Sequence, residues 1–156
     1  MSSPNLRSVE QLLSNPTNMD NVRELVTPDA TYVSLSLNNP SLKQIMPWCG
    51  THDKAGPAAI VETFINVGRH WETRAFDIEA IFESGETVQV NGTFTYQSKV
   101  LGIIKSSPFA IWCKLNAQGK VTYMRFMEDT FGTASTFEKS GKKTYAADPD
   151  GHEVEL

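Results

Sequence analysis

Apolar residues recur at helical spacing in two segments near the start of the chain. The first segment, residues 4–14, follows a Ser-Pro pair typical of a helix start and stops before a second proline. The second segment, residues 17–27, begins with Thr17 and Asp20 at capping-box spacing and stops before Pro28. Both patterns predict short amphipathic helices. Their apolar positions are Leu6, Val9, Leu12 and Leu13, followed by Val22, Leu25 and Val26.

A longer helix is predicted to begin at the Gly-Pro pair of residues 56–57. Its apolar residues are spaced by three or four positions, which places them on one continuous face. That face must pack against a large apolar surface. The residues on it are Ile60, Phe64, Val67 and Trp71.

Apolar and polar residues alternate in five other segments, and this alternation predicts strands. The alternation continues through Asn91-Gly92, which favours one uninterrupted strand with Gly92 at a β-bulge over a hairpin turn at that point. Turn-forming residues separate the last four segments, so we expect an antiparallel meander. The five segments are Ala30–Leu37, Ala75–Glu83, Thr87–Ser98, Phe109–Leu115 and Val121–Asp129.

The order of elements, helices first and strands afterwards, predicts an α+β domain. A curved antiparallel sheet with helices on its concave face has the shape of a cone, and the open end leaves a cavity for a small apolar ligand. Residues 38–56 are rich in Asn, Pro and Ser but include Met46 and Trp48, so we expect an ordered loop over that cavity. The chain divides into a domain, residues 1–137, and a polar C-terminal tail, residues 138–156, ordered at most in part.

The charge of the chain excludes some classes of partner. The 156 residues carry 18 acidic and 14 basic side chains, a formal net charge of −4, whereas nucleic-acid binding needs a basic face. No stretch is apolar enough for a signal peptide or a membrane span, so we expect a cytoplasmic protein with no membrane partner. Cys49 and Cys113 lack disulfide or metal-ligand spacing and are expected to be buried. The sequence predicts no metal site and no cofactor.

Residues 30–33 (Ala-Thr-Tyr-Val), followed after a loop by residues 56–60 (Gly-Pro-Ala-Ala-Ile) and Phe64, form an AT…G-x-x-A-I-x-x-F pattern. Residues 116–126 contain a Gly-Lys turn that enters a closing strand. Both features resemble the nuclear transport factor 2-like superfamily, which includes ketosteroid isomerases and SnoaL-like polyketide cyclases. The resemblance covers residues 5–137 and implies the cone-shaped, cystatin-like fold. That fold hosts many unrelated activities.

The resemblance carries over few catalytic residues. In ketosteroid isomerases, the positions of the aspartate base and of the oxyanion-hole acid correspond to Ser34 and Ile111 here, and the helical tyrosine falls near Leu12 or Leu13. Steroid isomerisation by that mechanism is therefore not expected. SnoaL-like cyclases have a catalytic aspartate at the end of the last strand, and the resemblance places it at Asp129.

Asp129 and His52 are the candidate catalytic residues. If Asp129 points into the cavity, burial raises its pKa and makes it a usable base near neutral pH. His52 lies in the loop predicted to cover the cavity, and a histidine is suited to proton transfer near neutral pH. As a pair they could remove and return a proton next to a carbonyl group. Two alternatives stay open: Asp129 solvated or paired with Arg125, and His52 on the surface.

Aromatic side chains are the candidates for the walls of the cavity. The strand at residues 109–115 carries an aromatic residue on each face, so both faces of the sheet must be covered. The superfamily commonly covers the convex face by dimerisation, and the resemblance therefore implies a homodimer. The candidate substrate-binding residues are Trp48, Phe64, Trp71, Tyr96 and Trp112.

Residues 148–156 (Asp-Pro-Asp-Gly-His-Glu-Val-Glu-Leu) resemble the closing motif of vicinal-oxygen-chelate metalloenzymes, in which the later glutamate, here Glu155, is a metal ligand. That fold needs paired βαβββ modules, and the helices-first order does not supply them. The other interpretation is a turn in the tail.

The sequence as a whole predicts a SnoaL-like protein that binds a small molecule. One hypothesis is a cofactor-independent cyclase, isomerase or dehydratase that acts on a hydrophobic carbonyl compound by proton transfer. The other is a non-catalytic module of the same fold that binds a ligand or another protein.

Overall fold

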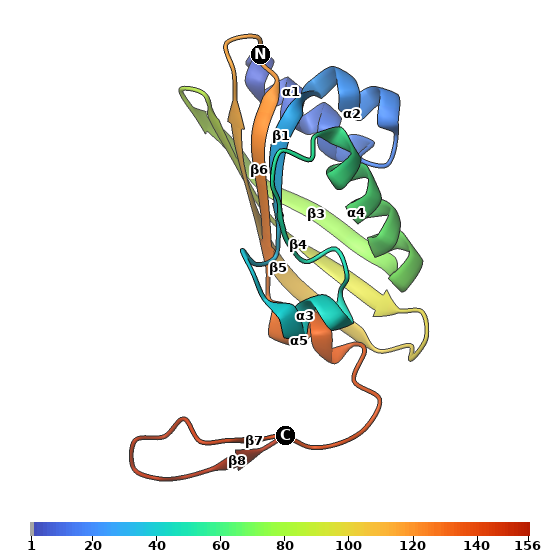
Figure 1. The fold of residues 1–156 in the computed structure, drawn as a ribbon, viewed down its shortest axis with the longest axis vertical. Helices are drawn as coiled ribbons and strands as arrows, with labels where there is room; N and C mark the ends of the chain where they lie inside the picture. Colours follow the sequence, from blue (N-terminus) through green and yellow to red (C-terminus); the bar gives the residue numbers. More distant parts are fainter. Residues whose placement is uncertain (1) are drawn as a thin grey trace.

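Six strands form one curved sheet, and the helices pack mainly on its concave side (Figure 1). The computed structural model describes residues 2–156. The helices are α1 (Pro4–Ser14), α2 (Met19–Leu25), α3 (Pro40–Ile45), α4 (Pro57–His70) and α5 (Thr130–Ser135). The strands of the sheet are β1 (Val26–Ser34), β2 (Gly50–His52), β3 (Trp71–Ser84), β4 (Thr87–Ser98), β5 (Ile104–Leu115) and β6 (Val121–Glu128).

Local sequence signals determine where the helices begin. Ser3, Asn18 and Asn39 cap α1, α2 and α3, because the side chain of each accepts a hydrogen bond from the backbone N–H three residues further on. Helix α4 begins directly after Gly56, whose φ is +69°. A Cβ atom on Gly56 would lie 2.2 Å from the carbonyl oxygen of Pro28, so only glycine fits where α4 approaches β1.

The strand order in the sheet is β2-β1-β6-β5-β4-β3. Strands β3 to β6 form the predicted antiparallel meander, but β1 pairs with β6 in parallel. The connection through α4 and three strands lets the last strand return alongside the first in the same direction. The predicted α+β cone is therefore confirmed, and the expectation of an entirely antiparallel sheet is corrected to a mixed sheet.

Strand β4 is uninterrupted at Gly92, as predicted. The irregularity lies on the neighbouring strand β3, between Ile78 and Ala80, opposite Gly92. A Cβ atom on Gly92 would meet the carbonyl oxygen of Asp77 at 2.1 Å and the ring of Phe109 at 2.6 Å. Glycine is therefore required here because a backbone and an aromatic ring both approach closely.

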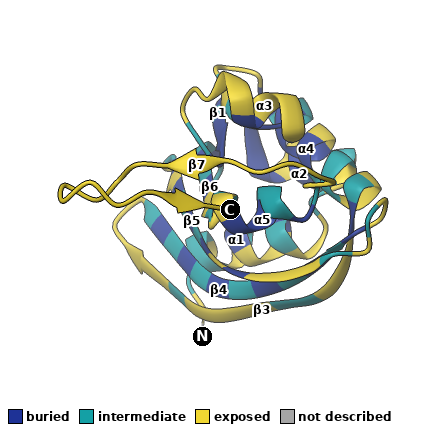
Figure 2. Cartoon of the chain, turned by 90° about the horizontal axis from the view of Figure 1, so that it is seen from below, coloured by how far each residue is buried: buried dark blue, intermediate teal, exposed yellow. Residues whose placement is uncertain are grey.

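Aromatic rings fill the concave side of the sheet. The alternation of buried and half-buried residues along β4 marks this face (Figure 2). Phe94 stacks on Tyr96 with ring centroids 4.0 Å apart, and Tyr96 stacks on Trp71 at 5.1 Å. On the next strands, the rings of Phe109 and Phe126 stack at 5.5 Å. This continuous row of rings forms the floor against which α4 packs.

Several element boundaries differ from the sequence predictions. Residues 38–56 contain α3 and β2 rather than a loop alone, and α5 was not predicted. Asn18 rather than Thr17 caps α2. Trp71 begins β3 instead of ending α4, because its backbone is extended, with φ −123° and ψ 148°. Its indole Nε1 donates to Thr136 Oγ1 at 2.8 Å in the core.

Residues 138–156 leave the body of the protein and contain a small hairpin of β7 (Thr144–Tyr145) and β8 (Val154–Glu155) (Figure 1). The hairpin is exposed along its whole length (Figure 2). Its one aromatic contact joins Tyr145 to Phe131 of α5, with ring centroids 6.4 Å apart. The segment expected to be ordered only in part thus has a defined hairpin.

Cys49 and Cys113 are buried and unpaired, as expected. Among residues 2–156, no helix combines the length and the apolar character needed to cross a membrane.

Candidate functional site

A small cavity lies between the concave face of the sheet, α4 and the segment before β2. Its volume is about 10 Å³, which is room for about one water molecule. The walls are mostly apolar and aromatic, with a few polar groups among them. The lining residues are Tyr32, Ser34, Leu35, Trp48, Thr63, Phe64, Val67, Tyr96, Phe126 and Glu128.

Glu128, the last residue of β6, is the acidic residue in this lining. It shares a face of the strand with Phe126, so its side chain points to the concave side. The Oε2 atom is enclosed and has no hydrogen-bond partner among residues 2–156. Unpartnered buried carboxyl oxygens are rare and indicate a functional group or a missing ligand.

Burial also shifts the ionisation of Glu128. Desolvation raises the pKa of its carboxyl group to about 7, and the negative charge of Asp129 adds to the rise. The nearby hydroxyl of Thr133 acts in the opposite direction and lowers the pKa of Glu128. Glu128 can therefore exist in both protonation states near neutral pH, which is what a group that accepts and returns a proton requires.

Two tyrosines flank Glu128 in the cavity. Burial raises the pKa of Tyr32 and of Tyr96 above the ordinary value of 10, and the Glu128 charge raises both further. Both phenols therefore stay protonated at neutral pH and can donate hydrogen bonds. The cavity combines one ionisable carboxyl group with two neutral donors.

Asp129 does not line the cavity, although it follows Glu128 directly. Its exposed side chain caps α5, and Oδ1 accepts a hydrogen bond from the backbone N–H of Gly132 at 3.0 Å. Successive residues of a strand point to opposite faces, so Asp129 and Glu128 cannot both enter the cavity. Of the two alternatives left open for Asp129, the structure shows the solvated one, and the neighbouring acid Glu128 lines the cavity instead.

His52 lies beside the cavity rather than in its lining. Its ring stacks on Tyr32 with centroids 6.0 Å apart, and Nε2 is 2.8 Å from the carbonyl oxygen of Trp48. Both of these neighbours line the cavity. The structure thus places His52 behind two of the walls and does not bring it together with Asp129.

Three of the five predicted aromatic residues, Trp48, Phe64 and Tyr96, line the cavity. Trp71 stands behind them, with its ring 5.3 Å from that of Trp48. Trp112 lies on the opposite, convex face of the sheet, so its predicted place in the pocket is corrected. It stacks there against the side chains of Lys114, Tyr123 and Arg125.

The wall at Leu35 has an unusual backbone. Its φ is +67°, which is rare for a leucine, and the N–H of Ser36 donates to the carbonyl oxygen of Ser34 at 2.7 Å. This three-residue turn is of the strained γ type. It begins the segment of residues 36–49, which carries Trp48 and ends before Gly50, a residue whose φ is +119°. Strained positions of this kind are concentrated at functional sites.

No group of three or more His, Cys, Asp or Glu side chains in residues 2–156 is arranged to hold a metal ion. The metal-ligand motif suggested for residues 148–156 lies in the exposed hairpin. Glu155 pairs with Lys142 at 3.0 Å, and His152 pairs with Asp148 at 2.7 Å. The metalloenzyme interpretation lacks the fold that it needs, and the motif forms a turn.

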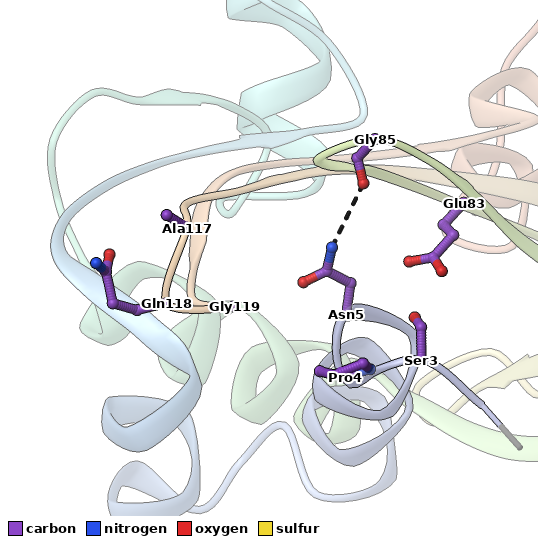
Figure 3. A pocket seen from close by; sticks show the side chains of 8 residues that line it. All are labelled: Ser3, Pro4, Asn5, Glu83, Gly85, Ala117, Gln118 and Gly119. Atoms are coloured by element: carbon purple, nitrogen blue, oxygen red, sulfur yellow. Dashed lines mark hydrogen bonds between the residues drawn. The ribbon is translucent and has the colours of Figure 1, made fainter.

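Two open hollows lie away from Glu128. One, of about 580 Å³, is bounded by α3, α5 and residues 138–156. The other, of about 530 Å³, lies between the start of α1 and two hairpin turns (Figure 3). In Figure 3, Asn5 reaches across to the turn, where Nδ2 donates to the carbonyl oxygen of Gly85 at 3.4 Å, and Glu83 lies on the side of Ser3. Among residues 2–156, no buried side-chain nitrogen or oxygen atom without a hydrogen-bond partner lines either hollow.

Sequence reasoning missed Glu128, although the signal was available. By alternation along the last strand, Phe126 and Glu128 share one side, opposite Met127 and Asp129. The resemblance directed the choice to the aspartate. Phe126 was the better indicator of the concave face, because a large aromatic side chain in the last strand is expected to be buried in the core.

Solved structures with the same fold identify its class. A nuclear transport factor 2-like protein from Burkholderia thailandensis matches with a TM-score of 0.71 and 19% identity, covering 89% of this chain and 100% of that one. TerC, crystallised with polyporic acid, matches with a TM-score of 0.70 and 21% identity over 88% of this chain and all of its own. IdmH of Streptomyces antibioticus, a candidate polyketide cyclase, matches with a TM-score of 0.65 and 10% identity, covering 87% of this chain and 99% of its own. The chain has the nuclear transport factor 2-like fold.

Two curated proteins are similar in sequence. Patulin synthesis protein F of Aspergillus clavatus is 44% identical over 131 residues, and patulin biosynthesis cluster protein F of Penicillium expansum is 41% identical over 131 residues. Each match covers 83% of this chain and 66% of the relative, so the chain spans just under two thirds of their length. No family model matches the chain.

Proposed function

We propose that this protein is a SnoaL-like enzyme that catalyses proton transfer on a small hydrophobic carbonyl compound, with Glu128 as the general base and acid. The observation that carries the proposal is the enclosed carboxyl oxygen of Glu128, which has no partner among residues 2–156 and lies in a cavity of aromatic side chains. A substrate C–H or O–H group would supply the missing contact.

The proposed reaction begins when the Glu128 carboxylate removes a proton from the carbon next to the substrate carbonyl. The C–H electron pair moves toward the carbonyl oxygen and gives an enolate. Tyr32 and Tyr96 donate hydrogen bonds to that oxygen as its negative charge develops. In an isomerisation, Glu128 then returns the proton to another carbon of the conjugated enolate. In a dehydration, the enolate expels the hydroxyl group on the β carbon as a C=C bond forms, and Glu128 protonates that leaving group to give water. In an aldol cyclisation, the enolate carbon attacks a second carbonyl carbon of the substrate, and Glu128 protonates the alkoxide that results.

The relatives support a small-molecule role. Their names assign them to patulin synthesis, and 41–44% identity makes a related kind of chemistry the best hypothesis for this chain. The cavity of about 10 Å³ must open to admit a substrate. We propose that the segment of residues 36–49 moves to open it, because that segment carries Trp48 and starts at the strained turn of Leu35.

We also propose that the protein works in the cytoplasm as a homodimer through its convex face. Trp112 and Arg125 give that face an aromatic and cationic centre, a composition typical of interfaces. Sedimentation velocity should show a dimer for the wild type and a shift to the monomer for Trp112→Glu. The measurement is made at about 100 µM protein, roughly 10 times the Kd expected for a weak dimer. A wild type that is monomeric at this concentration would contradict the proposal.

Deuterium exchange tests the proton-transfer chemistry without knowledge of the natural substrate. Cyclohexanone, cyclohex-2-enone and acetophenone serve as probes in D₂O at neutral pH, and NMR follows the loss of the protons next to the carbonyl group. We expect the wild type to accelerate exchange of at least one probe. Glu128→Gln should lose that acceleration by a factor of about 10²–10⁴.

Asp77→Asn is the matched control, because Asp77 is an exposed acid on the convex face. Exchange at the wild-type rate in this variant shows that loss of an acid elsewhere has no effect. Exchange that survives in Glu128→Gln but is lost in Asp129→Asn would return the role of the base to Asp129. Tight binding of a probe without exchange would instead support the non-catalytic module.

A further inference from the structure

Helix α4 carries a polar residue in the row of side chains that it packs against the sheet. The helix buries Ala59, Ile60, Val61 and Thr63. Thr63 is only 4% exposed, and spacings of three and four residues place it on the same face as Ile60 and Val67. Apolar side chains are expected at such positions of an amphipathic helix, so the hydroxyl of Thr63 is an exception to the pattern.

The hydroxyl of Thr63 is not used by the helix itself. A serine or threonine within a helix commonly donates to a carbonyl oxygen three or four residues earlier, and Ser14 in α1 and Ser135 in α5 do so. Among residues 2–156, the Thr63 hydroxyl makes neither this bond nor any other, and Thr63 lines the cavity. The fully enclosed side-chain atoms without a partner belong to Thr27 and Glu128, so the Thr63 hydroxyl borders open space. The helix therefore presents an unused hydroxyl group to the cavity.

The cavity has a sheet side and a helix side. Tyr32, Tyr96 and Glu128 lie on strands of the sheet. Thr63 lies on α4, which packs on the concave side of that sheet (Figure 1). In the proposed reaction, the sheet side holds the carbonyl group of the substrate. The hydroxyl on the helix side is then available to a different oxygen of the same molecule, because a hydroxyl group both donates and accepts hydrogen bonds.

The charge of the lining limits what that second oxygen can be. Among residues 2–156, no lysine, arginine or histidine side chain lines the cavity, and the carboxyl group in the lining is that of Glu128. A carboxylate or phosphate on the substrate would be buried without a counter-charge, beside a group of the same sign. The second oxygen therefore belongs to a neutral group, either a hydroxyl or a second carbonyl.

We propose that Thr63 is a specificity-determining residue, whose hydroxyl selects substrates that carry a neutral oxygen function in addition to the carbonyl group. This inference rests on the proposed function, because it takes the carbonyl group to be held on the sheet side. It narrows the substrate class to neutral carbonyl compounds with a second oxygen. Packing alone does not require the hydroxyl, since valine has nearly the same shape and no polar group to desolvate.

Binding of matched probes tests this role while the natural substrate is unknown. The probes are acetophenone and its 3-hydroxy and 4-hydroxy derivatives, and isothermal titration calorimetry measures the Kd of each. We expect the wild type to bind at least one hydroxylated probe about fivefold more tightly than acetophenone, the effect of one net hydrogen bond. Thr63→Val should lose this preference, so that the two Kd values become equal. Thr63→Ser should keep it, because the hydroxyl remains.

Thr95→Val is the matched control. It removes a hydroxyl from the convex face, where Thr95 Oγ1 lies 2.7 Å from Ser106 Oγ. Its preference among the probes should equal that of the wild type. The urea midpoint of Thr63→Val should not fall, because the substitution breaks no hydrogen bond within the chain. A lost preference without a lower midpoint shows that the hydroxyl acts on the ligand and not on the fold.

Two results would overturn the role of Thr63: a wild type that binds the three probes equally, or a Thr63→Val variant that keeps the preference. The probe 4-acetylbenzoate should bind more weakly than acetophenone, and equal or tighter binding would contradict the neutral substrate class.

Deuterium exchange on the same probes separates this inference from the proposed function. Exchange that depends on Glu128, with a preference that does not depend on Thr63, would support the proposed function and overturn this inference. A preference that is lost in Thr63→Val, without exchange of any probe in the wild type, would support selective binding at Thr63 and contradict the proposed proton transfer.

Discussion

The concave and convex faces of β5 and β6 carry side chains of different kinds. On the concave face, Phe109 and Phe126 are buried and Glu128 lies beside them, where desolvation makes its carboxyl group costly to ionise. On the convex face, Trp112 and Arg125 are half-buried in the single chain and stack on each other, with the guanidinium carbon 4.7 Å from the indole centroid. The same two strands therefore carry an ionisable group toward the interior and an aromatic and cationic cluster on the outer face. Because successive residues point to opposite faces, a shift of one residue in register would exchange the two.

The largest expected difference between the two faces is in packing energy. Phe94→Ala removes a ring that stacks on Tyr96 and Phe76 within the core, and it should lower the free energy of unfolding by about 3–5 kcal/mol. Trp112→Ala on the convex face should cost about 1 kcal/mol, because it removes half-buried cation–π contacts. Urea denaturation measures both values. Similar losses would show that the convex face is as well packed as the core.

The next effect depends on pH. The folded-state pKa of Glu128, about 7, lies above its ordinary value of 4.5, so the folded protein keeps the proton that the unfolded chain releases between these values. The contribution of Glu128 to stability therefore falls as pH rises from 4.5 to 7, by about 3 kcal/mol. Glu128→Gln has no titrating group at this position. The free energy of unfolding of the variant minus that of the wild type should therefore rise by about 3 kcal/mol between pH 4 and pH 8.

Thermal or urea unfolding across that pH range measures this difference. Asp77→Asn serves again as the control, because its carboxyl group is exposed on the convex face. A difference between Glu128→Gln and the wild type that stays constant with pH would show that Glu128 is solvated. The concave face would then lose the electrostatic character that distinguishes it.

The smallest expected effect concerns the cap of α5. Asp129→Ala should lower the free energy of unfolding by about 1 kcal/mol, because the N–H of Gly132 loses its acceptor. Asp129→Asn should stay within a few tenths of a kcal/mol of the wild type. The comparison is made at pH 5 and at pH 8, since a loss that changes with pH would indicate an additional coupling to Glu128.

Most of the fold was predictable because its signals are local. Helix α1 and strand β4 have the predicted bounds, and α4 begins at the predicted pair, with Gly56 as its cap and Pro57 as its first residue. The short α3 and α5 carry too few apolar residues for a period to appear, so only their caps mark them. The parallel pairing of β1 with β6 joins strands far apart in the sequence, and no local pattern specifies such a contact.

The candidate site was predictable only in part, for the same reason. Trp48, Phe64 and Tyr96 were assigned to the cavity because aromatic residues near a predicted opening are good candidates, but the same argument included Trp112. Nothing local distinguishes the two faces of β5, since each carries aromatic residues. Tyr32 and Ser34 were not predicted as lining residues because Val33 and Leu35, which alternate with them along β1, form the more apolar side of that strand.

By itself, the sequence determined that Phe126 and Glu128 share one side of the last strand and that Asp129 takes the other, because side chains alternate along any strand. Only the tertiary structure decided which side is concave. That choice depends on the direction in which the sheet curves and on where α4 packs, both set by contacts between distant segments. The curvature encloses Glu128 and leaves Asp129 at the surface, and the difference in burial gives these adjacent acids different chemistry.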